Sequence, residues 1–143
     1  MRVYLAADSS QQKVMQELRE LLRTRKIGCT SRWLDVDLMA NKGQPYTEVE
    51  LAEWAQKDLE DVESAHVLIA FNPESHHKQG TGGRHVELGY AIAMEIPIIY
   101  VGEKRENIFH YHPSIAAVLN HGAYTTPEFF ADALAFTIAD IQP

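Results

Sequence analysis

Three apolar runs of strand length, separated by segments of helical character, constrain the fold of this chain more than any other feature. The runs cover residues 3–7, 66–71 and 96–101, and their apolar residues are consecutive rather than alternate. Such runs are typical of strands buried on both faces, which occur in parallel sheets covered by helices on both sides. With a weaker strand candidate at 29–36, the order predicts an α/β fold. We expect a flavodoxin-like or Rossmann-like three-layer sandwich with a mostly parallel sheet of about five strands.

The segments between these runs carry helical signals. An apolar stripe of helical period predicts a first helix that ends near 26–28, with the members Val14, Leu18, Leu21 and Leu22. A capping-box pattern from Thr47 to Glu50 predicts a second helix. Its expected apolar stripe consists of Leu51, Ala52, Ala55, Leu59 and Val62. A third helix is expected at about 84–94, apolar nearly all round, and Pro127 marks the first turn of a last helix.

Length and charge limit the classes of protein to consider. The 143 residues suit one domain, 1–143, with a well-buried core. No run approaches the ~18 apolar residues of a membrane span, and the first apolar stretch is too short for a signal peptide. We therefore expect a cytoplasmic protein without a membrane partner. The net charge of -7 would repel a polyanion, which argues against nucleic acid as a partner.

In open α/β sheets, ligands bind beyond the carboxyl ends of the strands, which directs attention to residues 4–10, 71–87 and 102–112. Glu87 is the most informative residue there, because it is expected in the first turn of a helix that is otherwise apolar. The helix dipole stabilises such a carboxylate by ~0.3–1 kcal/mol, which is a sufficient structural explanation on an exposed helix. On a buried helix an ionised carboxylate is costly, and a retained one indicates function. The residues alone leave both explanations open.

The other polar residues of these segments give weaker signals. The loop from Gly80 to Gly83 offers backbone N–H groups at a helix start, which favours polar or anionic ligands, but it matches neither a dinucleotide fingerprint nor a P-loop. The seven histidines fit no zinc pattern, so we expect neither a metal site nor a cofactor. Asp58 and Asp61 are expected to be solvated beside the apolar stripe of their helix. Tyr4 is by default a core aromatic residue.

These positions nevertheless resemble one known family, the nucleoside 2-deoxyribosyltransferases. The matching stretches are 3–6 (VYLA), 57–70 (KDLEDVESAHVLIA) and 81–91 (TGGRHVELGYA). The resemblance implies that Glu87 attacks the anomeric carbon of a deoxynucleoside, that Tyr4 orients this carboxylate, and that Asp58 handles the proton of the base. Such chemistry follows the logic of a retaining glycosidase, with a covalent glycosyl-enzyme ester. The substrates would then be a deoxynucleoside and a free nucleobase.

The resemblance also implies how the sugar is held. Thr81 stands where the family often has an Asp that contacts the 5′-hydroxyl, and Gly83 and Arg84 follow it. Asn107 resembles an asparagine that reaches the sugar from a neighbouring subunit, which implies a homo-oligomer. Related hydrolases of deoxynucleoside 5′-monophosphates carry a basic, glycine-rich loop after the first strand. The loop here begins Ala7-Asp8, with an acid and no arginine, so a nucleoside is favoured over a nucleotide.

Three functions remain in competition. The favoured one is a transferase that exchanges the base of a deoxynucleoside through a deoxyribosyl ester on Glu87. The second is a hydrolase of deoxynucleoside 5′-monophosphates, for which Arg84 is the motivation. The third is a module of the same fold that binds a nucleotide without turnover, suggested by the departures at Thr81 and near Asp8.

Overall fold

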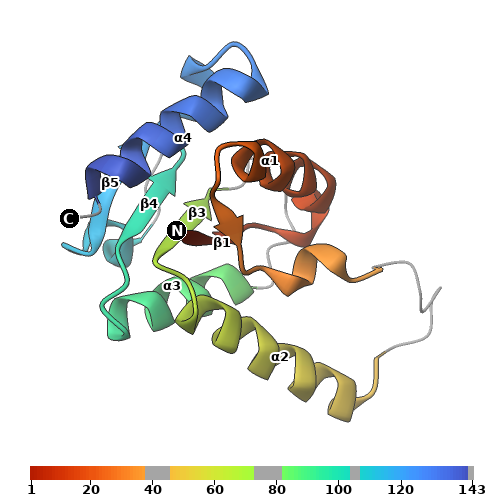
Figure 1. Ribbon diagram of the computed structural model, residues 1–143. Helices are drawn as coiled ribbons and strands as arrows, with labels where there is room; N and C mark the ends of the chain where they lie inside the picture. Colours follow the sequence, from red (N-terminus) through yellow and green to blue (C-terminus); the bar gives the residue numbers. More distant parts are fainter. Residues whose placement is uncertain (38–45, 73–81, 104–106, 142–143) are drawn as a thin grey trace.

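The computed structural model describes residues 1–37, 46–72, 82–103 and 107–141. Within these residues, five strands form one parallel sheet in the order β2-β1-β3-β4-β5 (Figure 1). The strands are β1 (Arg2–Ala6), β2 (Gly28–Cys29), β3 (Val67–Phe71), β4 (Ile98–Val101) and β5 (Ile115–Leu119). The predicted α/β fold with a parallel sheet of about five strands is confirmed.

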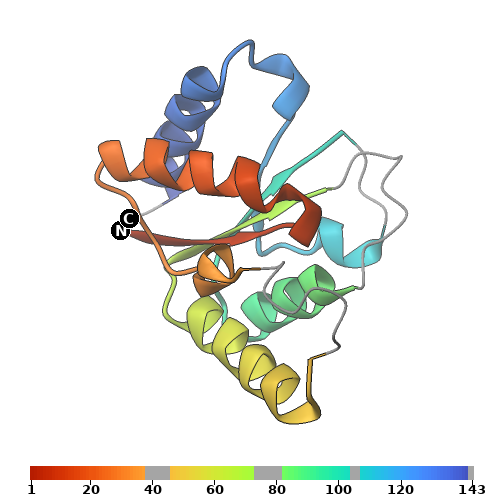
Figure 2. The same cartoon turned by 90° about the vertical axis from the view of Figure 1, so that its right-hand side faces the viewer.

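Four α-helices are seen in the described residues, and they cover both faces of the sheet (Figures 1 and 2). They are α1 (Gln12–Thr24), α2 (Glu48–Glu63), α3 (Gly83–Ala93) and α4 (Pro127–Ile141). A hydrophobic core lies on each face of the sheet, and alternate residues of β3 point into one or the other. Ile69 packs with α1 and α4, whereas Leu68 packs with α2 and α3. This alternation produces the three-layer sandwich. None of the helices in the described residues is long and apolar enough to cross a membrane.

The strand order determines where a ligand pocket can form. β1 pairs with β3 on one side and with β2 on the other, so the chain order reverses between β1 and β3. At such a switch point the connections leave in opposite directions and open a crevice beyond the carboxyl ends of the strands. The loop that follows β1 therefore borders the expected site.

The strand expected at 29–36 is mostly wrong. β2 ends at Cys29, and a 3-10 turn, η2 (Arg32–Asp35), takes the place of its continuation. Side chains replace the missing strand contacts: the Leu5 backbone N–H donates to Ser31 Oγ at 2.8 Å, and Trp33 Nε1 donates to the Leu5 carbonyl at 2.9 Å. Because these bonds satisfy the edge of β1, the chain can leave the sheet early, and this departure makes room for a pocket.

The fifth strand was not located from the sequence. β5 follows a 3-10 turn, η3 (Ile108–Tyr111), in the segment that was expected to be irregular. It pairs only with β4, and half-buried residues alternate along it with the exposed Ala116 and Val118. An edge strand with alanine at its centre lacks the continuous apolar run that identifies a buried parallel strand.

The predicted helices are present, but several of their buried faces differ from the prediction. In α1 the buried residues are Met15, Leu18 and Leu22, while Val14 is 49% exposed. Leu51 of α2 is 54% exposed and Val86 of α3 is 62% exposed, so neither the predicted α2 stripe nor an α3 buried on most sides is correct. The capping box at Thr47 and the start of the last helix at Pro127 are confirmed.

Candidate active site

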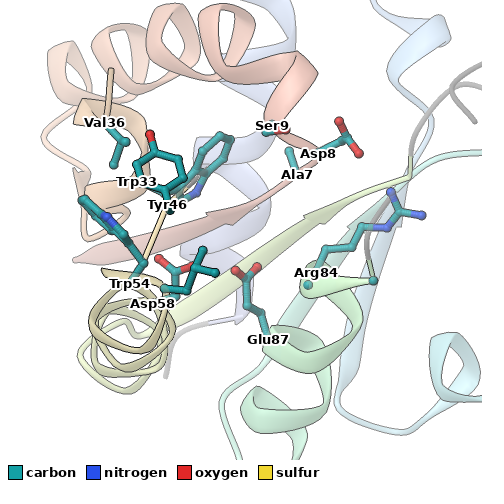
Figure 3. A pocket seen from close by; sticks show the side chains of 13 residues that line it. Ala7, Asp8, Ser9, Trp33, Val36, Tyr46, Trp54, Asp58, Arg84 and Glu87 are labelled. Carbon is teal, nitrogen blue, oxygen red and sulfur yellow. The ribbon is translucent and has the colours of Figure 1, made fainter. Parts of the chain in front are cut away.

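A pocket of about 260 Å³ opens at the switch point between β1 and β3 (Figure 3). This volume lies just below the usual range for small-molecule sites, roughly 300–1,000 Å³. The loop after β1, the η2 segment, α2 and the start of α3 all contribute to its wall. The lining residues are Ala7, Asp8, Ser9, Trp33, Val36, Tyr46, Leu51, Trp54, Asp58, Gly82, Gly83, Arg84 and Glu87.

Glu87 extends from α3 into this pocket and is held by Tyr4. The Tyr4 hydroxyl donates a hydrogen bond to Glu87 Oε1 at 2.8 Å. Tyr4 itself is fully buried in β1 and does not line the pocket. Because α3 begins at Gly83, Glu87 lies in the second turn of the helix rather than the first. The helix dipole acts mainly within the first turn, so it is a weaker explanation for this carboxylate than the sequence suggested.

The surroundings of this pair favour neutral forms of both groups. Burial, opposed by the Tyr4 hydrogen bond and assisted by the charge of Asp58, raises the pKa of Glu87 to about 8. Burial and the nearby carboxylates of Glu87 and Asp58 raise the pKa of Tyr4 far above its ordinary value. Tyr4 therefore remains a hydrogen-bond donor throughout the accessible pH range. A strongly perturbed carboxylate in a pocket is a candidate functional group.

Asp58 provides the second acid of the pocket. Burial and the negative charge of Asp61 raise its pKa to about 6, while Arg32 acts in the opposite direction. Its Oδ1 atom is buried and has no hydrogen-bond partner among the described residues. Figure 3 shows the Asp58 and Glu87 side chains extending from different helices toward the same space. Two carboxyl groups with raised and different pKa values are suited to proton transfer near neutral pH.

Arg84 and Tyr46 contribute two further polar atoms that lack partners. Arg84 Nη1 and the Tyr46 hydroxyl are both buried, and neither has a hydrogen-bond partner in the part of the chain that the structure describes. Buried polar atoms are satisfied in the great majority of cases, so unsatisfied ones require an explanation. Since both residues line the pocket, a ligand with complementary polar groups would satisfy them.

The start of α3 depends on glycine. Gly82, the N-cap of the helix, has φ of 84°, a left-handed conformation that strains residues with a Cβ atom. Gly83 follows as the first residue of α3 and lines the pocket. At the opposite wall, Asp8 caps a 3-10 turn, η1 (Ser9–Gln11), by accepting a hydrogen bond from the Ser10 backbone at 2.9 Å.

The structure brings most of the predicted site residues together. Six of the predicted site residues line this pocket: Ala7, Asp8, Asp58, Gly83, Arg84 and Glu87. Tyr4 reaches it through its contact with Glu87. Asn107 does not line it; its Nδ2 atom lies 3.5 Å from His85 Nδ1, and its Oδ1 caps η3. Thr81 lies outside the described residues.

The aromatic wall of the pocket was missed. Trp33, Tyr46 and Trp54 gather on the side of the pocket that carries Asp58 (Figure 3). Trp33 was expected in a strand and Tyr46 next to a loop, so neither position indicated a side chain in a pocket. The four-residue spacing of Trp54 and Asp58 places both on one helix face and was a usable signal.

The prediction for Asp61 was also wrong. This carboxylate is only 4% exposed and is paired with Arg32, whereas a solvated side chain was expected. The inner face of α2 therefore carries acidic residues, and a prediction that locates this face from apolar residues alone misses them. Among the described residues, no group of three or more His, Cys, Asp and Glu side chains is arranged to hold a metal ion.

The sheet order and the pocket place the chain in the class of open α/β proteins with a ligand pocket at the switch point of a parallel sheet. The family model of the nucleoside 2-deoxyribosyltransferases matches residues 3–129. The chain belongs to the nucleoside 2-deoxyribosyltransferase family. The matched range includes Tyr4, Asp58 and Glu87. No curated protein sequence matches the chain significantly.

Solved structures of low sequence identity share the fold. A CMP N-glycosidase from Clostridium botulinum, BcmB, is 17% identical, with a TM-score of 0.62 over 95% of this chain and 99% of that one. A 2-deoxyribosyltransferase from Bacillus psychrosaccharolyticus is 19% identical, with a TM-score of 0.58 over 84% and 86% of the two chains. The protein BlsM is 19% identical, with a TM-score of 0.60 over 99% and 94%.

Proposed function

We propose that this protein is a nucleoside 2′-deoxyribosyltransferase that exchanges the base of a deoxynucleoside through a covalent deoxyribosyl ester on Glu87. The observation that carries the proposal is the partly buried Glu87 carboxylate, held by the Tyr4 hydroxyl at 2.8 Å in a pocket that also contains Asp58. Membership of the family gives this chemistry its prior support.

Each residue then has a defined role in two displacements. The ionised Glu87 oxygen attacks the anomeric carbon, the bond from this carbon to the base nitrogen breaks, and the base takes a proton from Asp58. In the second displacement a new base attacks the same carbon, the ester bond to Glu87 breaks, and Asp58 accepts the proton that the base nitrogen loses. Tyr4 orients the Glu87 carboxylate through its hydrogen bond. Two inversions retain the anomeric configuration.

The first turn of α3 and the loop after β1 would hold the sugar. Ala7 and Asp8 lie on one side, and Gly83 and Arg84 lie on the other, with Thr81 as a further candidate. The acid at Asp8 favours an uncharged 5′-hydroxyl over a phosphate. The aromatic wall suits the flat face of a base, because stacked rings gain energy beyond the area that they bury.

A second candidate is hydrolysis of the N-glycosidic bond of a deoxynucleoside 5′-monophosphate. The buried, unpartnered Arg84 Nη1 favours it, since a guanidinium is a common partner of phosphate. The relative BcmB is a CMP N-glycosidase, and it covers 95% of this chain. In this case water replaces the incoming base in the second displacement. A third candidate, a binding module without turnover, would retain the same pocket.

We also propose that Asn107 acts in a second copy of the chain. Its position outside the pocket of its own chain is consistent with a role across an interface. The adjacent surface carries exposed apolar side chains: Ile108 is 78% exposed, Phe109 57% and Val86 62%. Exposed apolar groups of this kind favour association. Sedimentation of the protein and of the Asn107→Ala and Ile108→Asp variants tests this arrangement. A wild-type monomer would contradict it.

One experiment separates the three functions. The protein is incubated with each common deoxynucleoside and a second free base, and in parallel with the corresponding 5′-monophosphates. Base exchange identifies the transferase, whereas release of base from monophosphates alone identifies the hydrolase. Mass spectrometry of the quenched reaction should find a deoxyribosyl adduct on Glu87, and Glu87→Gln should lower turnover at least ~10³-fold while ligand binding survives. Absence of exchange and of base release would refute both catalytic proposals.

A further inference from the structure

An ion pair between the half-exposed Arg32 side chain and a buried carboxylate, that of Asp61, lies where η2 packs against α2. Asp61 is 4% exposed and uses both of its carboxylate oxygens. Oδ1 accepts a hydrogen bond from Arg32 Nε at 2.7 Å, and Oδ2 accepts one from the Arg32 backbone N–H at 2.8 Å. Thr30 Oγ1 also donates to the Asp61 carbonyl at 2.7 Å. A buried carboxylate is costly unless it is paired in this way, so the pair determines how η2 and α2 fit together.

The pair adjoins the pocket through both of its members. Asp58 precedes Asp61 by three positions on α2, a spacing that places the two side chains side by side on one helix face. Trp33 follows Arg32 directly and lines the pocket, with its indole tied to the Leu5 carbonyl. The ion pair therefore connects the element that carries Asp58 to the element that carries the aromatic wall.

We propose that Arg32 and Asp61 are a positioning pair that holds Trp33 and Asp58 on adjacent walls of the pocket and controls whether Asp58 carries its proton. The second half of this inference rests on the proposed function, in which Asp58 is the proton-transfer group. Neither residue lines the pocket, so both act through their neighbours and neither touches the substrate.

The two members influence Asp58 in opposite directions. The negative charge of Asp61 favours the protonated form of Asp58, and the positive charge of Arg32 favours the ionised form. The two influences oppose each other while both charges are present, and that of Asp61 is the larger. Removing either charge unbalances the pair.

Several other charged or titratable groups surround Asp58, and the substitutions at Arg32 and Asp61 leave these groups in place. They are Lys57 and Glu60 on its own helix, Glu87 and Arg84 on α3, Tyr4 on β1, and Tyr46 before α2. Glu60 provides a matched control, because it binds the other side of Arg32, with 3.1 Å between Glu60 Oε2 and Nη2, and is exposed.

The test is an NMR titration of the Asp58 side-chain carboxyl in the whole protein. We expect Asp61→Asn to lower the pKa of Asp58 by roughly one unit and Arg32→Gln to raise it by roughly one unit, since a unit charge one helical turn away has about this effect. Arg32→Lys should shift it less than Arg32→Gln, and Glu60→Gln should leave it within about 0.3 units. Opposite signs are the distinguishing result, because a purely structural contact would give no such pattern.

Two outcomes overturn the inference: shifts of the same sign in Asp61→Asn and Arg32→Gln, or an unmoved titration in Arg32→Gln. Arg32 is half-exposed, so its variants keep the test available if Asp61→Asn does not fold. The titration needs no turnover. If Glu87→Gln retained full activity, the proposed function would fail while the opposite shifts would still stand. In the active protein, the lower edge of the pH profile of kcat/KM should move with the same signs.

Discussion

The Tyr4 hydroxyl and Glu87 Oε1 lie 2.8 Å apart, although the two residues are separated by 83 positions in the sequence. Parallel pairing of β1 with β3 and the packing of α3 on the same face of the sheet bring them together. The bond fixes the orientation of the partly buried Glu87 carboxylate. The same contact lowers the pKa of Glu87, opposing the effect of burial.

Removing this hydrogen bond should therefore weaken catalysis without removing the nucleophile. In Tyr4→Phe the pKa of Glu87 should rise above its value of about 8, because the bond that favours the ionised form is lost. A hydrogen bond to a charged group is worth about 1.5–3 kcal/mol, so kcat/KM should fall roughly 10- to 100-fold. Steady-state kinetics of Tyr90→Phe serve as the control, since the Tyr90 hydroxyl donates to Glu63 and Tyr90 is not among the residues that line the pocket. Equal activity in Tyr4→Phe and wild type would contradict the role of Tyr4.

The pH dependence of kcat/KM should be bell-shaped, with a flat region between about pH 6 and about pH 8. Below this range the rate rises with pH as Glu87 ionises. Within it, the gain in ionised Glu87 is offset by the loss of protonated Asp58. Above it Glu87 is fully ionised, and the falling protonated fraction of Asp58 lowers the rate.

Asp58→Asn should change the shape of this profile as well as its height. Asparagine cannot supply the proton, so activity should fall by about 10²–10⁴-fold, the usual contribution of general acid catalysis. The alkaline decline should disappear, because it arises from ionisation of Asp58. A variant that keeps the bell shape would show that another group provides the proton.

Glu87 should reduce the stability of the protein at alkaline pH. The folded protein holds a proton on Glu87 up to about pH 8, whereas the unfolded chain releases it near the ordinary value of 4.5. The folded state therefore binds more protons between these values, and its stability falls as the pH rises from 4.5 through 8. Glu87→Gln keeps an acceptor for Tyr4 and removes this loss.

We expect Glu87→Gln to be more stable than wild type by about 1–3 kcal/mol at pH 8 and equally stable near pH 4.5. Urea unfolding at both pH values measures the difference. Glu53→Gln, a change at an exposed position on α2, is the matched control and should show no such dependence. If the difference in stability between the variant and the wild type did not grow with pH, Glu87 would not have a raised pKa in the folded protein.

The intrinsic fluorescence of the protein should report on the pocket. The chain contains two tryptophans, Trp33 and Trp54, and both line the pocket. A base stacked on this wall should quench much of the emission, whereas free deoxyribose should not. Trp54→Phe should lose part of the quenching, and its KM for the base should rise with a smaller change in kcat. Unchanged emission at saturating base would place the base elsewhere.

Local sequence determined the types of the main elements. Consecutive apolar residues in β1, β3 and β4 require burial on both faces, so they predict a parallel sheet before any contact is known. Thr47 and Pro127 are residue types that favour the start of a helix, so they mark the starts of α2 and α4 in the sequence itself. Glu87 could be selected because one charge among apolar neighbours is conspicuous, and the family motif around it raised its importance.

Tertiary structure decided what surrounds these elements. Ser31 and Trp33 shorten β2 by bonding to Leu5, an effect of side chains that no strand pattern contains. Asp61 is buried because Arg32, 29 positions away, pairs with it. The contact of Tyr4 with Glu87 likewise exists only after the sheet and α3 assemble. The spacing of apolar residues predicts which face of each segment is buried. Residues distant in sequence come into contact only in the folded chain, and these contacts determine the chemistry of the pocket.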